Sequence, residues 1–216
     1  MGAKQAAGKL SIAYKTIFVF LLLSGILARA DLFSDSPQLH TLYSFTAISN
    51  CFILLVTLAS IYRTALGSIN MLLSRFRIIG LMMILATGLI YHFILLPQKT
   101  ADDPLYQAIT YGNIIAHYVS PTAMLLDWIL FDPKGRISKW EPMIFSAIPF
   151  GYFVTASIYG FFGPVIEGKD TSFVYFFMDW NKLGLWGVLS WILPILSGIL
   201  LLTYSLYFVD SVWGKK

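Results

Sequence analysis

The sequence predicts an all-α membrane protein with six transmembrane helices. The chain of 216 residues is 57% hydrophobic and only 12% charged, whereas soluble domains carry about 25% charged residues. Six apolar stretches are long enough to cross a bilayer, which requires roughly 20 residues of helix. The basic residues concentrate in alternate loops. These observations favour an integral membrane domain over a water-soluble globule.

Turn and capping residues delimit the predicted helices. Asp132-Pro133-Lys134-Gly135 is a turn that ends the fourth helix. Ser138 and Glu141 have the spacing of a capping box, which predicts that the fifth helix begins there. We therefore predict a single domain, residues 1–216, with helices at residues 12–30, 41–65, 76–97, 105–131, 140–163 and 184–209.

The distribution of charge predicts the orientation. If both termini face the cytoplasm, that side holds 11 of the 15 basic residues: Lys4, Lys9, Lys15, Arg63, Arg75, Arg77, Lys134, Arg136, Lys139, Lys215 and Lys216. The positive-inside rule therefore favours cytoplasmic N- and C-termini in the plasma membrane. Scattered basic residues in short loops do not form a nucleic-acid surface, so no nucleic-acid partner is expected.

The first helix has a second interpretation. Basic residues precede its apolar core, and Ala28-Arg29-Ala30 resembles a signal-peptidase site. Cleavage there would leave five spans with the same remaining topology. The single cysteine, Cys51, excludes a disulfide within the chain.

Several polar residues fall inside the predicted spans, in the half that faces away from the cytoplasm. Hydrocarbon penalises uncompensated polar groups, so such a cluster indicates a functional site. Thr46 and Asn50 share a helix face because they are four residues apart. The predicted site consists of Thr46, Ser49, Asn50, His92, Asn113, His117 and Ser120.

The alternative for each residue is a purely structural hydrogen bond. Thr46 could bond to its own helix carbonyl, and Asn50 and Asn113 could join neighbouring helices. Asp127 continues the polar stripe of the fourth helix. We expect it near the cytoplasmic end, solvated or paired with Arg136 or Lys139.

Two chemistries could use the cluster. A hydroxyl becomes nucleophilic when a base such as imidazole takes its proton, and an amide can stabilise the resulting oxyanion. A zinc site would use His40, His92 and His117, but neither an HxxxH nor an HExxH pair is present. We therefore predict no metal and no cofactor.

Two segments carry a family resemblance. They are Tyr43-Ser44-Phe45-Thr46-Ala47-Ile48-Ser49-Asn50 and Asn113-Ile114-Ile115-Ala116-His117-Tyr118-Val119-Ser120-Pro121. Both resemble the bacterial Pr-six-Pr membrane proteins and, more distantly, the eukaryotic androgen-induced-gene and androgen-dependent TFPI-regulating proteins. The eukaryotic proteins are multipass threonine hydrolases of fatty acid esters of hydroxy fatty acids. The resemblance implies that Thr46 is a nucleophile and His117 its base.

Three functions follow as expectations. The first is a hydrolase of lipid or fatty-acid esters, in which Thr46 and His117 are catalytic. Its substrate-binding residues would be Asn50, Asn113, His92, Ser49 and Ser120, and membrane lipids or lipid-like molecules its substrates. The second is a small-solute or lipid transporter that binds its substrate at the same cluster. The third is a noncatalytic membrane scaffold.

Overall fold

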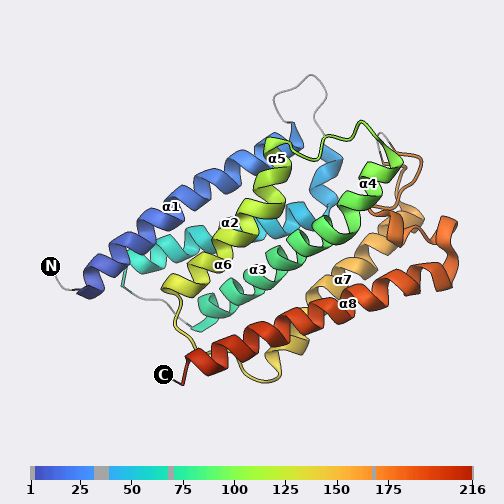
Figure 1. The fold of residues 1–216 in the computed structure, drawn as a ribbon. Coiled ribbons are helices and arrows are strands. Elements are labelled where there is room, and N and C mark those ends of the chain that lie inside the picture. The colour runs from blue at the N-terminus through green and yellow to red at the C-terminus, as the bar shows by residue number, and fades with distance from the viewer. Residues whose placement is uncertain (1–2, 32–38, 68–70, 167–168, 216) are drawn as a thin grey trace. The chain divides into compact units, whose positions relative to one another are not determined.

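The computed structural model describes residues 3–31, 39–67, 71–166 and 169–215, and these residues form helices and loops without a strand (Figure 1). Six helical segments are long and apolar enough to cross a membrane, as predicted. They are Ala6–Ala30, Phe45–Ala65, Met71–Asp102, Tyr111–Phe131, Glu141–Phe162 and Trp180–Trp213. The chain is therefore an all-α, multi-pass membrane protein.

Several spans combine more than one helical element. The elements are α1 (Ala3–Ala30), η1 (Leu39–Tyr43), α2 (Phe45–Ala65), α3 (Met71–Ile90), η2 (Tyr91–Leu95), α4 (Leu96–Asp102), α5 (Tyr111–Ile114), η3 (Ile115–Val119), α6 (Ser120–Phe131), α7 (Glu141–Phe162), η4 (Phe176–Met178) and α8 (Trp180–Trp213). Elements η1 and η4 are 3₁₀-helices, whereas η2 and η3 are single turns of π-helix.

The chain divides into two compact units. The first comprises Met1–Leu42 and Thr46–Lys134, and the second comprises Tyr43–Phe45 and Gly135–Lys216. The first unit contains α1, nearly all of α2, and every element from α3 to α6. The second contains α7, η4 and α8.

The fourth span is shorter than predicted. It begins at Tyr111 rather than at residue 105, because the Oγ1 atom of Thr110 accepts the backbone N–H of Asn113 and caps the helix there. The third span is longer than predicted and continues to Asp102, with Pro97 in the first turn of α4, where a missing N–H is tolerated. Residues 103–110 therefore form a non-helical connection between these two spans.

Helix α3 packs closely against α6 and η3 in the first unit. Leu81, Met82 and Ile84 of α3 are completely buried. Gly88 permits the approach to η3, since a Cβ atom there would lie 2.9 Å from the carbonyl oxygen of His117. This packing places Tyr91, three residues further along the chain, beside the imidazole of His117.

A network of four charged side chains, three of them buried, joins α1, α3 and the end of α6. The carboxylate of Asp127 lies 2.7 Å from Lys15 Nζ and 2.6 Å from Arg77 Nη2. Arg77 Nε donates to Asp132 at 2.9 Å. The expected pairing of Asp127 with Arg136 or Lys139 is therefore wrong, because two cations assigned to cytoplasmic segments, Lys15 and Arg77, lie buried within spans.

Local polar contacts hold the second unit at both ends of α8. The carboxylate of Asp210 accepts the backbone N–H groups of Arg136 and Ile137 at 2.8 and 2.9 Å. At the other end, Asp179 caps α8 by accepting the N–H groups of its first turn. The Glu141 carboxylate accepts the N–H of Ser138 at 2.7 Å, which is one of the two bonds of the predicted capping box, but α7 begins at Glu141 rather than at Ser138.

Candidate functional site

The candidate site lies where the two π-helical turns of the first unit meet. The ring of Tyr91, in η2, stacks on the imidazole of His117, in η3, with centroids 3.7 Å apart and planes at 8°. In the same pair of turns, the hydroxyl group of Tyr118 lies 3.1 Å from His92 Nδ1. A π-helical turn inserts a residue into a helix and is frequently found at functional sites.

His117 is buried, with 3% of its surface exposed, and its two nitrogens have different surroundings. Nε2 lies 3.1 Å from Nη1 of Arg29, at the end of α1. Because arginine is only a donor, Nε2 is the acceptor in this contact, and we assign the proton of the neutral ring to Nδ1. Nδ1 is buried without a hydrogen-bond partner.

Asn113 links Arg29 to the loop that precedes α5. Its Oδ1 accepts from Arg29 Nη1 at 3.2 Å, and its Nδ2 donates to the hydroxyl of Tyr106 at 3.1 Å. The Tyr106 hydroxyl also lies 3.2 Å from that of Tyr91. A continuous set of polar contacts thus runs from His117 through Arg29, Asn113 and Tyr106 to Tyr91.

Asn50 joins α2 to η3. Its Nδ2 donates to the carbonyl oxygen of Thr46 at 2.8 Å and to that of Ala116 at 3.4 Å. Asn50 and Ala116 each lie five residues into their spans, which is about 7.5 Å of helix. The start of α2 and the His117 turn therefore lie at similar depth along their spans. They do so because the fourth span begins at Tyr111, later than predicted.

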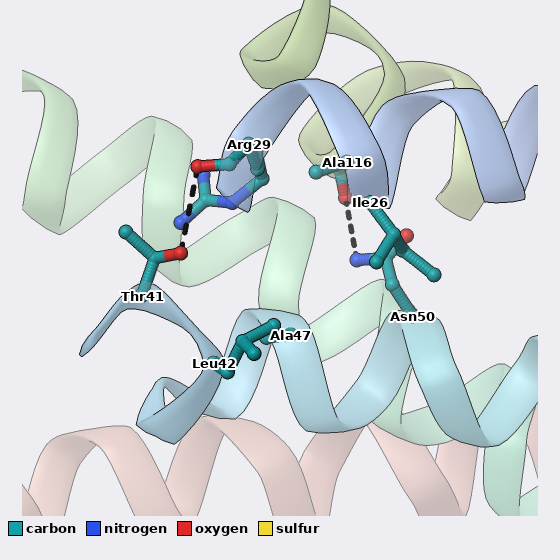
Figure 2. A pocket seen from close by; sticks show the side chains of 7 residues that line it. All are labelled: Ile26, Arg29, Thr41, Leu42, Ala47, Asn50 and Ala116. Atoms are coloured by element: carbon teal, nitrogen blue, oxygen red, sulfur yellow. Dashed lines mark hydrogen bonds between the residues drawn. The ribbon is translucent and has the colours of Figure 1, made fainter. Parts of the chain in front are cut away.

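A small pocket lies between α1, α2 and η3 in the first unit (Figure 2). Its volume of about 10 Å³ is close to the space that one water molecule requires. Its wall is mostly apolar, although Arg29 and Asn50 contribute to it. Figure 2 shows Thr41 next to Arg29, and Asn50 bonded to the carbonyl of Ala116.

Thr46 lies in the first turn of α2, and 4% of its surface is exposed. The described contacts of Thr46 and His117 include no hydrogen bond between the two side chains. The residue after Thr46 and the residue before His117, Ala47 and Ala116, both line the pocket. Catalytic contacts often tighten only when substrate is bound, so a direct contact between Thr46 and His117 would require a rearrangement on binding.

The remaining predicted residues are distributed around this centre. Ser49 is fully buried and accepts a hydrogen bond from Thr87 at 3.1 Å, away from the imidazole contacts. Ser120 is fully buried, and its hydroxyl has no hydrogen-bond partner. His92 is exposed and contacts Tyr118. His92 and Ser49 thus make contacts of their own, separate from those of His117.

Three residues of the site could not be recognised from sequence reasoning. In the sequence Arg29 forms part of a segment that resembles a cleavage site, and Tyr91 and Tyr106 are two among 12 tyrosines. The sequence contains one indication of the role of Arg29, because this residue lies inside the predicted first span, where a cation is unusual.

No metal-binding cluster of His, Cys, Asp or Glu occurs among the residues that the structure describes. Comparison of the chain with protein-family models, with curated proteins and with solved structures finds no match.

Proposed function

We propose that this protein is a plasma-membrane hydrolase of lipid or fatty-acid esters, with both termini in the cytoplasm. The observation that supports it most is the environment of His117. Its imidazole is buried in a π-helical turn, held by Tyr91 and Arg29, and lies next in sequence to a residue of an apolar pocket. Asn50 bonds to the carbonyl groups of Thr46 and Ala116, and so holds the start of α2 at the same depth as the His117 turn.

The contact between Arg29 and His117 must open before the imidazole can act as a base. Nε2 holds its lone pair toward Arg29 in this arrangement, so it cannot accept a proton from Thr46 at the same time. The carbonyl oxygen of an ester is an alternative acceptor for the Arg29 N–H. Substrate binding would therefore release His117 Nε2 and polarise the ester carbonyl in one rearrangement.

The reaction then follows nucleophilic catalysis through an acyl-enzyme. Thr46 Oγ1 attacks the carbonyl carbon, and its proton passes to His117 Nε2. Arg29 or the amide of Asn50 or Asn113 stabilises the oxyanion. The C–O bond of the ester breaks, the leaving alkoxide takes the proton from His117, and water subsequently hydrolyses the acyl-threonine ester.

The pocket must widen to admit a lipid. A volume close to that of one water cannot hold an acyl chain. Two adjacent π-helical turns offer a place for this change, because converting a π-helical turn to regular α-helix shifts the register of the residues that follow.

Labelling with a fluorophosphonate probe tests the proposal. The wild-type protein in liposomes should be labelled, whereas Thr46→Ala and His117→Ala should not. Thr64→Ala is the matched control, because Thr64 lies at the opposite end of α2 and bonds to its own helix. Equal labelling of wild type and Thr46→Ala, with both proteins folded, would contradict the proposal.

A transporter is the second candidate, and the buried charge network favours it. Ionisable groups within spans commonly mark the path of a substrate or proton, and Lys15, Arg77 and Asp127 are almost completely buried there. Uptake of solute into proteoliposomes without product formation would support it. A scaffold would instead show only a loss of thermal stability in Thr46→Val.

A further inference from the structure

The loop between the third and fourth spans has two chemically different sides. Residues 103–110 connect α4 to α5 without helical structure. From Leu105 to Thr110 exposed and half-buried residues alternate, along a backbone that turns at residues 103–106 and 106–108. One side therefore faces the protein and the other faces its surroundings.

The inward side belongs to the candidate site. Tyr106 contacts the hydroxyl of Tyr91 and accepts from Asn113. Nδ2 of Asn113 also lies within 3.5 Å of the carbonyl oxygens of Gln107 and Ala108. These contacts attach the loop to the network that includes His117.

The outward side is apolar at two of its three positions. Leu105 is 87% exposed and Ile109 is 85% exposed, with Gln107 between them. Exposure of this extent is costly in water, because about 25 cal/mol is gained for each Å² of apolar surface that is removed from it.

We infer that Leu105 and Ile109 insert into the bilayer, and that lipid thereby holds the 103–110 loop over the candidate site. The connection joins the ends of two spans, at Asp102 and Tyr111, and its Tyr106 stays in contact with them, so the loop lies at the membrane surface. Apolar side chains at this level are buried in the boundary between headgroups and acyl chains. The partner is the leaflet at this end of the spans. The inference is independent of any catalytic activity.

Fluorescence quenching in liposomes tests this inference directly. In a Cys51→Ser background, an environment-sensitive fluorophore would be attached to Leu105→Cys or Ile109→Cys. The matched control is Asp170→Cys, in a loop where the aspartate side chain is 78% exposed and forms an ion pair with the exposed Lys182. Retention of helicity and elution volume would show that each labelled protein is folded.

If Leu105 and Ile109 insert into the bilayer, lipid-borne and aqueous quenchers should rank in opposite order at these positions and at residue 170. The fluorophore at residue 105 or 109 should emit at shorter wavelength and lose more intensity with brominated lipids than with aqueous iodide. The fluorophore at residue 170 should lose more with iodide. Iodide quenching at residues 105 and 109 equal to that at residue 170 would overturn the inference, as would protection of both positions from both quenchers.

Discussion

Replacement of Asp127 by asparagine should strongly destabilise the protein, because Asp127 pairs with two buried cations of the first unit. In the native protein Asp127 is fully buried and lies within 2.7 Å of Lys15 and 2.6 Å of Arg77. The two cations, together with the carboxylates of Asp127 and Asp132, carry no net charge. Asp127→Asn leaves this set with one uncompensated positive charge.

The expected loss follows from the cost of an unpaired buried charge. Removal of one partner from a buried ion pair costs about 3–5 kcal/mol, because the other partner stays desolvated. Among the described residues, Lys15 then keeps its hydrogen bond to Ser11 and its contact with the Phe131 ring, and loses its closest carboxylate. Unfolding by SDS, followed through helicity in mixed micelles, would measure the change in free energy of unfolding.

An exposed pair with the same geometry provides the control. Lys182 and Asp170 are also 2.7 Å apart, but their side chains are 56% and 78% exposed. Water and salt screen such a pair, so Asp170→Asn should leave the unfolding midpoint unchanged. The double variant Asp127→Asn, Lys15→Met restores neutrality around Arg77 and Asp132 and should recover much of the loss. A loss below about 1 kcal/mol for Asp127→Asn alone would refute this reasoning.

Two further predictions concern the second unit. Gly160→Ala should lower the free energy of unfolding by about 1–3 kcal/mol, because the added Cβ atom would collide with the ring of Phe173. Gly151→Ala is the control and should not lower it, because the space around Gly151 is open. Unfolding by SDS would compare the two variants. The hydrogen bond and charge of Lys182 lower the pKa of Asp170, so their interaction is fully present above the ordinary carboxyl pKa and is lost as pH falls through the lowered value. Lys182→Met should raise that pKa in an NMR titration, and an unchanged titration would contradict the pairing.

The number and order of the spans could be predicted from the sequence because each depends on local composition. Twenty apolar residues specify a span regardless of its neighbours. The residues at which the spans begin and end could be predicted less well. The fourth span begins at Tyr111 because Thr110 caps it, and a threonine in an apolar stretch gives no sign of a helix start until the backbone before it is seen to be extended.

The contacts of the site depend on features that a sequence pattern does not contain. The π-helical turns at Tyr91–Leu95 and Ile115–Val119 change which residues share a face, so regular helical spacing misplaces the partners of His117. The predicted partners of Asp127 are wrong for a related reason. Lys15 is assigned to a cytoplasmic segment from its sequence position, but it lies nine residues after the start of the first span at Ala6, and its side chain reaches Asp127 from a different helix.

His117 and Asp127 lie ten residues apart on one span, and their surroundings differ in a way that bears on function. Asp127 is held by two cations in regular helix, and any change there leaves a buried charge without its partner. His117 lies in a π-helical turn, keeps one ring nitrogen without a hydrogen-bond partner and shares the other with an arginine that has a second acceptor in Asn113. A group with an unused donor and an exchangeable partner can change its bonds at small cost, whereas a closed ion network cannot. Variants at His117 should therefore alter chemistry or binding while the fold persists, and variants at Asp127 should alter the fold first.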